Sequence, residues 1–241
     1  MTTAPREVRL GCVYLPQFAP ERLAATAAAA DEAGVDDLWV WEDCFLAGGV
    51  SAAAIALSHS RSLSVGIGVA PVPMRNPALT AMEIATLARA FPGRVRVGLG
   101  HGVQGWMAQI GARVESPMTL FREHLTCIGA LLRGERVTFH GRYVHLEDVA
   151  LDWPPDPGTE LLAAAMGPKT LRLSGELATG TVITQGTTRR PRRRGSAGAR
   201  GELAAWRRAV VDRDVSDVRD GCRRGGGVGS RVPPLAVRPH G

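Results

Sequence analysis

The protein has 241 residues, a formal net charge of +6 and a pI near 9.9, and its length predicts one sizeable domain with its own core. Its four cysteines form no C-x-x-C pair, which argues against a zinc site and against a disulfide framework. No signal-peptide pattern opens the sequence and no apolar stretch is long enough to span a bilayer, so a cytoplasmic protein without membrane contact is expected.

Strand-like and helix-like segments alternate over residues 1–185. Helical patterns occupy 20–33, 76–91, 116–132 and about 167–178, with Asn76-Pro77 and Ser116-Pro117 opening the middle two. A segment at 137–149 alternates like a small hairpin. Short runs rich in apolar and β-branched residues predict strands at 8–15, 37–42, 63–71, 94–100, 161–166 and 181–184.

This alternation predicts an α/β fold with a parallel sheet. At roughly 30 residues per unit it matches about six of the eight βα units of a TIM (β/α)8 barrel, hence an incomplete barrel over residues 1–185. A doubly wound sheet is the alternative. Against it, the first strand is not followed by G-x-G-x-x-G, and the glycines of GLGHGVQGW after the fourth strand lack the dinucleotide-binding spacing.

Four segments, in order, resemble the luciferase-like monooxygenase superfamily, and within it the oxidoreductases that use the deazaflavin coenzyme F420. They are DDLWVWED, VGIGVAPVPMRNPALTAMEIATLARAFPGRVRVGLGHG, FHGRYVHLEDV and AAAMGPKTLRLSGELATGTVIT, and together they cover about residues 8–185. The resemblance implies a TIM barrel whose strand carboxyl ends hold a flavin or deazaflavin. It implies hydride transfer as the chemistry, or oxygen activation if the cofactor is FMN.

The resemblance also implies site residues at the ends of the second and third strands. Glu42 and Asp43 are adjacent, so only one of them faces the barrel mouth. The deazaflavin enzymes usually carry an acidic residue followed by histidine there, and Asp43 departs from that pattern. We expect Asp43 to contact ring or substrate, with a helix cap or salt bridge as the alternative. Glu42 is the predicted cofactor-binding residue of the pair. Gly68-Val69 falls where the family has a bulged, often non-prolyl cis peptide that supports the cofactor ring; simple relief of packing by Gly66 and Gly68 is the alternative.

Further site residues are implied after the fourth and fifth strands. An imidazole at His101 would titrate near neutral pH and could donate to substrate or cofactor, with Gly102 and Trp106 lining the same mouth. A purely structural histidine is the alternative. Met166 and Gly167 lead into a helix whose free N–H groups would bind the cofactor phosphate, or would form an ordinary helix start. The histidines show no metal-ligand spacing, so no metal is expected.

The resemblance stops near Gln185, and the remaining residues differ in composition. Residues 1–185 carry 15 basic and 18 acidic side chains, a net charge of −3, whereas residues 186–241 carry 14 and 5, a net charge of +9. The basic residues of this tail are all arginine, and ten glycines accompany them. One helix over 201–214 is conceivable, but no strand pair is recognisable.

Three interpretations of residues 186–241 are open. The first is a basic arm, which would bind phosphates. The second is a divergent barrel ending, which would still show strands. The third is a change of reading frame in a G+C-rich gene, which would give a segment rich in arginine, glycine, alanine and proline. We favour the change of frame, which makes the tail disordered or out of frame. An open barrel leaves sheet edges unpaired, so weak stability and little or no activity are expected.

The sequence therefore predicts an oxidoreductase that transfers a hydride between coenzyme F420 and a small organic substrate. An FMN-dependent monooxygenase on the same barrel is the first alternative. A nucleic-acid-binding protein acting through the basic tail is an alternative of another class, although nucleic acid is not expected as a partner. The substrate is not readable, and the oligomeric state is open, with a homodimer as one option.

Overall fold

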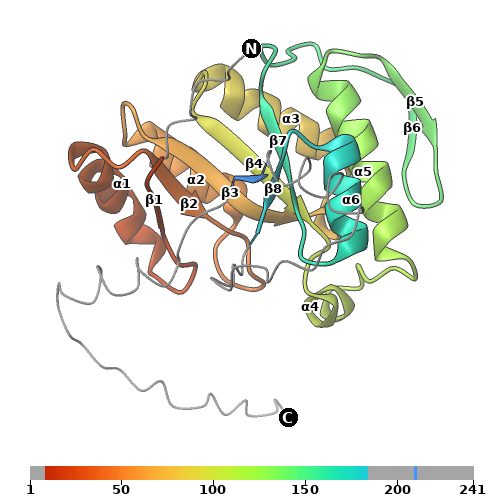
Figure 1. Cartoon of the computed structure of the whole chain (residues 1–241), viewed down its shortest axis with the longest axis horizontal. Coiled ribbons are helices and arrows are strands. Elements are labelled where there is room, and N and C mark those ends of the chain that lie inside the picture. Colours follow the sequence, from red (N-terminus) through yellow and green to blue (C-terminus); the bar gives the residue numbers. More distant parts are fainter. Residues whose placement is uncertain (1–8, 184–208, 211–241) are drawn as a thin grey trace, which may run out of the picture.

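The computed structural model of the chain describes residues 9–183 and 209–210, and its centre is one parallel sheet (Figure 1). The strand order is β1-β2-β3-β4-β7-β8-β9, and every neighbouring pair in this sheet is parallel. The bounds are Gly11–Val13 for β1, Asp37–Val40 for β2, Ser64–Pro71 for β3, Val95–Gly100 for β4, Glu160–Ala164 for β7, Gly180–Val182 for β8 and Ala209–Val210 for β9.

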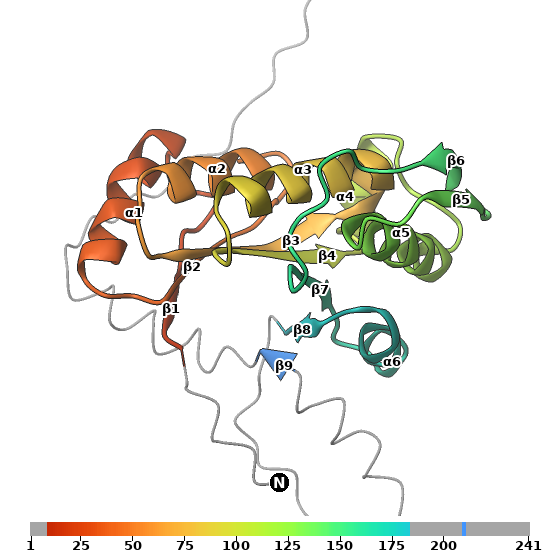
Figure 2. The ribbon, with the colours of Figure 1, turned by 90° about the horizontal axis from the view of Figure 1, so that it is seen from above.

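Helices connect the strands and lie along the outer side of the sheet. Figure 2 shows that the sheet curls, with α1, α2, α3 and α5 following its convex face. A doubly wound sheet would carry helices on both faces, so the predicted incomplete TIM barrel is confirmed for β1 to β8. The helices are α1 (Leu23–Glu32), α2 (Gly49–Ser58), α3 (Pro77–Ala90), α4 (Gln104–Gln109), α5 (Pro117–Leu132) and α6 (Pro168–Leu177), with 3-10 turns η1 (Pro20–Arg22) and η2 (Val72–Met74).

The predicted hairpin is present as β5 (Val137–His140) and β6 (His145–Val149), paired antiparallel. Glu123 of α5 holds it in place. The buried carboxylate of Glu123 accepts three backbone N–H groups just before β6, from Arg142 at 2.7 Å and from Tyr143 and Val144 at 2.9 Å each. Within the described ranges, none of the helices combines the length and the apolar character that crossing a membrane would need.

The hydrophobic core lies between the convex face of the sheet and the helices. Asn76 caps α3 as its sequence position predicts, because its Oδ1 accepts the Ala78 N–H at 2.8 Å. The strands supply alternate residues to the core, as the two-residue period of a strand requires. Core residues include Leu38, Val40, Val65, Ile67, Val97 and Leu99 from the strands and Leu57, Ile84, Phe121, Leu125 and Ile128 from the helices.

The other strand residues form layers on the concave face. At the amino end of the strands this layer is charged. Asp37 of β2 contacts Arg9 at 3.1 Å and Arg96 of β4 at 3.3 Å, and Arg96 in turn contacts Glu160 of β7 at 3.2 Å. Arg9 also donates to the Ser64 hydroxyl at 2.9 Å. The network links four strands across the base of the half-barrel.

The next concave layer is built around the Trp39 ring. A Cβ atom placed on Gly66 would lie 2.3 Å from Cε3 of Trp39, and one on Gly68 would lie 3.0 Å from the same atom. Trp39 is only 5% exposed. The two glycines of β3 therefore leave the space that the indole of β2 fills.

Gly66→Ala is expected to lower the free energy of unfolding by about 1–3 kcal/mol, because the added methyl group overpacks against Trp39. Gly105→Ala in α4 is the matched control, since a Cβ atom there meets nothing within 4 Å. Urea denaturation of the full chain measures both changes. Equal stability of the two variants would contradict the packing of the Trp39 ring against Gly66 of β3.

Within the basic tail, the structure describes one short strand, β9. Ala209 and Val210 of β9 pair with Thr181 and Val182 of β8. At these two positions the structure corrects both the helix expected over 201–214 and the expectation that the tail supplies no strand. The domain boundary at residue 185 and the change of reading frame lie outside the described residues, and both stay hypotheses.

Candidate functional site

The candidate site lies at the carboxyl ends of the parallel strands, on the side of the molecule where α4 is found (Figure 1). In a parallel βα barrel these ends share one rim, and the loops that follow them form the active site. The sequence-predicted residues come to this rim from four strands: Glu42 and Asp43 after β2, Gly68 and Val69 in β3, His101, Gly102 and Trp106 after β4, and Met166 and Gly167 after β7.

The backbone at Gly68-Val69 has the predicted form. The peptide bond between these residues is cis, and the pairing of β3 with β4 shifts register between Gly68 and Ala70. The Glu42 N–H donates to the Val69 carbonyl at 3.3 Å, which ties this bulge to the end of β2. A second non-prolyl cis bond joins Cys44 to Phe45. The support of a cofactor ring by Gly68-Val69 stays a prediction.

The Val69 side chain forms an apolar floor beneath the rim. A Cβ atom on Gly98 would lie 3.0 Å from Val69 Cγ1, and one on Gly100 would lie 2.8 Å from Val69 Cγ2. Gly98 and Gly100 of β4 therefore allow Val69 to lie flat on the sheet. The sequence analysis did not include these two glycines among the site residues. Their alternate positions in the strand VRVGLG, which put them on one face of the sheet, were the signal that could have identified them.

Glu42 is part of the framework under the rim. The residue is 6% exposed, and its carboxylate forms a two-point ion pair with Arg75, at 2.5 and 2.7 Å. The Gly49 N–H at the start of α2 donates to the same carboxylate at 3.1 Å. Both oxygens thus have protein partners, which gives Glu42 a positioning role; its predicted contact with a cofactor gains no support from this geometry.

Asp43, unlike its neighbour Glu42, takes no part in the ion pair with Arg75. It is half-buried, and burial raises the pKa of its carboxyl group, an effect that a hydrogen bond from the Trp41 side chain partly opposes. Among the described residues no cation pairs with Asp43. A carboxyl group with a raised pKa and no ion pair is a candidate for accepting and returning a proton.

His101 presents a neutral imidazole to the rim. Burial lowers its pKa, and the hydrogen bond to the Pro117 carbonyl, with Nδ1 at 3.3 Å, opposes that shift. The ring packs on Phe121 with the two centroids 4.6 Å apart. In the tautomer that donates from Nδ1 to Pro117, Nε2 is an acceptor. The geometry therefore favours acceptance of a hydrogen bond over the donation expected from the sequence.

Gly102 fixes the turn that carries His101. Its φ of +69° is in the left-handed region, and a Cβ atom there would lie 2.9 Å from Met107 Sδ. The Gln104 amide donates to the carbonyls of His101 and Gly102 at 3.2 and 3.4 Å. Trp106 is half-buried on α4, one turn along from this loop.

The start of α6 offers hydrogen-bond donors. Gly167 is the N-cap, and no side chain caps this helix. Pro168 has no N–H, so the free donors are the N–H groups of Gly167, Lys169 and Thr170. Such a helix start binds phosphate well. Met166, 62% exposed, stands beside it.

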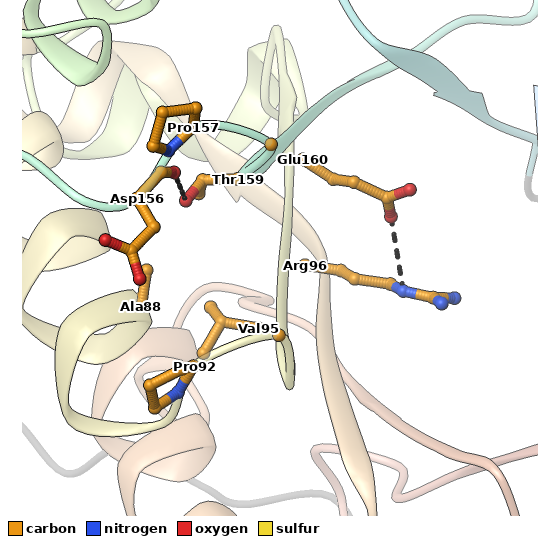
Figure 3. A pocket seen from close by; sticks show the side chains of 10 residues that line it. Ala88, Pro92, Val95, Arg96, Asp156, Pro157, Thr159 and Glu160 are labelled. Atoms are coloured by element: carbon orange, nitrogen blue, oxygen red, sulfur yellow. Dashed lines mark hydrogen bonds and ion pairs between the residues drawn. The ribbon is translucent and has the colours of Figure 1, made fainter.

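A separate cavity of about 250 Å³ opens at the opposite rim, at the amino ends of β4 and β7 (Figure 3). Arg96 and Glu160 form an ion pair on its wall, and the Thr159 hydroxyl donates to the Asp156 carbonyl at 3.2 Å. The amino-terminal rim of a βα barrel serves stability rather than chemistry. This cavity is therefore not part of the candidate site.

Comparison with known proteins places these features in a family. The family model of the luciferase-like monooxygenases matches residues 4–223. An F420-dependent glucose-6-phosphate dehydrogenase of Beutenbergia cavernae is 33% identical over 188 residues, 72% of this chain and 55% of the relative. A 5,10-methylenetetrahydromethanopterin reductase of Methanolobus tindarius is 28% identical over 173 residues, 72% of this chain and 53% of the relative. The chain spans about half the length of the curated relatives it matches.

Solved structures share the fold. The coenzyme F420-dependent tetrahydromethanopterin reductase of Methanopyrus kandleri superposes with a TM-score of 0.65 at 25% identity, over 73% of this chain and 56% of that one. The FMN-bound oxygenating constituent of 3,6-diketocamphane monooxygenase of Pseudomonas putida gives a TM-score of 0.62 at 18% identity, over 73% and 58%. With its curled parallel sheet and the match over residues 4–223, the chain belongs to the luciferase-like monooxygenase family.

Proposed function

We propose that the chain is an F420-dependent oxidoreductase that transfers a hydride between the coenzyme and a small organic substrate. The observation that carries the proposal is the pairing of an apolar floor with an uncapped helix start on one rim. Val69 lies flat on β4, and the donors of Gly167, Lys169 and Thr170 open α6. Curated relatives at 28–33% identity are named as F420-dependent dehydrogenases or as the methanopterin reductase.

The residues present fit such a cofactor. The flat apolar surface at Val69 suits one face of a deazaflavin ring, and the N–H groups at the start of α6 suit its phosphate. FMN carries a ring and a phosphate too, so the fit alone does not choose between them. The choice of F420 over FMN rests on the curated relatives, because the FMN-bound structural neighbour, at 18% identity, supports only the fold. When bound, the coenzyme supplies a two-electron acceptor or donor.

Asp43 is proposed as the proton-transfer residue. In the oxidation direction the carbinol C–H bond breaks, and the hydride leaves the substrate with both electrons. The hydroxyl proton passes to the Asp43 carboxylate as the carbon–oxygen double bond forms, and the reverse direction returns it. His101, neutral and with Nε2 free to accept, would orient the same hydroxyl group. Asp43 thus takes the place of the histidine usual in the deazaflavin enzymes.

Titration of the full chain with F420 and with FMN, followed by quenching of tryptophan fluorescence, tests the proposal. We expect saturable F420 binding that Trp106→Ala weakens about tenfold, as loss of one aromatic contact of about 1.4 kcal/mol would do. Thr159→Ala at the opposite rim is the control and should leave F420 binding unchanged. Binding of FMN but not of F420 would contradict the choice of coenzyme.

A further inference from the structure

An open cavity of about 430 Å³ lies beside the candidate site, where η2 and the start of α3 meet α5 and the turn between β5 and β6. None of the site residues predicted from the sequence is in its lining. The two places are neighbours, because the Met74 Sδ at this cavity lies 3.6 Å from the Cys44 Sγ after β2. The lining consists of 72–77, 111–114, Leu120, His124, Tyr143 and Val144. The proposed function makes no use of this cavity.

Much of the cavity wall is apolar. Val72, Leu120 and Val144 are buried, with 3–6% of each residue exposed, and they come from η2, from α5 and from the hairpin turn. Met74 is 36% exposed and adds apolar surface that solvent reaches. Sites for small molecules combine such a lining with a few polar groups that fix the orientation of the ligand. The polar groups of this lining therefore decide which ligand fits.

Three polar side chains of the lining have donor groups that find no acceptor among the described residues. The Tyr143 hydroxyl accepts the Ser116 N–H at 2.9 Å, which leaves its own O–H to donate. The Asn76 Oδ1 accepts the Ala78 N–H at 2.8 Å, which leaves the amide nitrogen as a donor. Arg113 is exposed, and its guanidinium forms no ion pair or hydrogen bond with the described part of the chain.

The other polar side chains of the lining are already engaged. All three guanidinium nitrogens of Arg75 contact carboxylates, two of them Glu42 and one of them Glu83. Both ring nitrogens of His124 face backbone carbonyls, Nδ1 that of Leu120 at 3.0 Å and Nε2 that of Arg75 at 3.1 Å. No aspartate or glutamate is among the lining residues. A ligand in the cavity thus meets free donors, a free positive charge and the amino end of the α3 dipole.

We propose that this cavity binds a small organic carboxylate. The apolar body of the ligand lies against Val72, Leu120 and Val144. Its carboxylate accepts hydrogen bonds from the Arg113 guanidinium and the Tyr143 hydroxyl. A carboxylate suits these donors because it only accepts hydrogen bonds and because the guanidinium fork matches its two oxygens. The cavity is thus a second ligand site, separate from the one proposed for the coenzyme.

Titration of the full chain with phenylacetate, followed by saturation-transfer NMR, tests the proposal. We expect saturable binding that Arg113→Gln weakens about tenfold, because a charge-assisted hydrogen bond is lost. Tyr143→Phe should weaken it about threefold to tenfold through loss of the hydroxyl donor, with urea denaturation showing that this variant stays folded. Arg61→Gln is the matched control, because Arg61 is also an exposed arginine without a side-chain partner among the described residues and lies outside the cavity lining.

Two further ligands separate the charge from the apolar body. Phenylacetamide keeps the shape of phenylacetate without its charge, and acetate keeps the charge without the ring; each should bind about tenfold more weakly or less. Absence of phenylacetate binding, an equal loss in Arg61→Gln and Arg113→Gln, or equal binding of phenylacetamide would overturn the proposal. Displacement of phenylacetate by F420 would overturn it too, by placing phenylacetate at the candidate site. A chain that binds phenylacetate but not F420 would contradict the proposed function and support this second site.

Discussion

Arg75→Met is expected to lower the free energy of unfolding by about 3–5 kcal/mol, because it leaves the Glu42 carboxylate buried without a counter-charge. Arg75 binds Glu42 at two points and Glu83 at 3.0 Å, and it is itself largely buried. The ion pair joins the end of β2 to the segment between β3 and α3, so its loss loosens the rim as well as the core. Urea denaturation of the full chain measures the change.

An exposed ion pair provides the control for Arg75. Arg122 and Glu176 meet at 2.7 Å on the outer surface, and Arg122→Met should cost less than about 1 kcal/mol. A second variant, Glu42→Leu with Arg75→Met, removes both charges and should recover much of the stability. If Arg75→Met lowers the free energy of unfolding no more than Arg122→Met does, the Glu42 carboxylate does not depend on Arg75 for its counter-charge.

Asp43→Asn is expected to reduce turnover with F420 by about 10²–10⁴-fold, the usual contribution of a positioned acid or base. The amide keeps the size of the side chain but cannot take the hydroxyl proton, so F420 binding should persist. Asp156→Asn at the opposite rim is the matched control and should leave turnover unchanged. Full activity in Asp43→Asn would remove Asp43 from the reaction and point to His101 as the remaining candidate.

The pH dependence of turnover separates a chemical role of Asp43 from a structural one. Burial raises the pKa of its carboxyl group, and oxidation of an alcohol needs the carboxylate, so the oxidation rate should fall as pH drops through that raised pKa. Trp41→Phe removes the hydrogen bond that opposes the shift. The acidic limb of the profile should then move to higher pH, and an unmoved limb would contradict the assignment.

The sequence predicted the half-barrel because its strands and most of its helices carry clear periodic patterns. Phe121, Leu125 and Ile128 form the expected stripe of α5, and the bulge appears at Gly68. The sequence did not predict α2, whose alanine-rich segment buries several residues and leaves no polar stripe to read.

Other features depend on contacts between distant segments, which no local pattern encodes. Glu42 and Arg75 are 33 residues apart, and their ion pair engages the carboxylate of a residue that the sequence predicted to bind the cofactor. The fit of Trp39 over Gly66 is likewise a contact between neighbouring strands. The lowered pKa of His101 comes from its burial against Phe121, which the spacing of the motif GLGHG does not reveal.

Hydrogen-isotope transfer from substrate to coenzyme tests whether the chain transfers a hydride. The full chain is incubated with oxidised F420 and cyclohexanol deuterated at the carbinol carbon, with oxygen excluded, and the reduced coenzyme is examined by mass spectrometry. We expect one deuterium to move from the carbinol carbon to the coenzyme and cyclohexanone to form in equal amount. Cyclohexanone without label in the coenzyme, or oxidation of substrate only with FMN and oxygen, would contradict it.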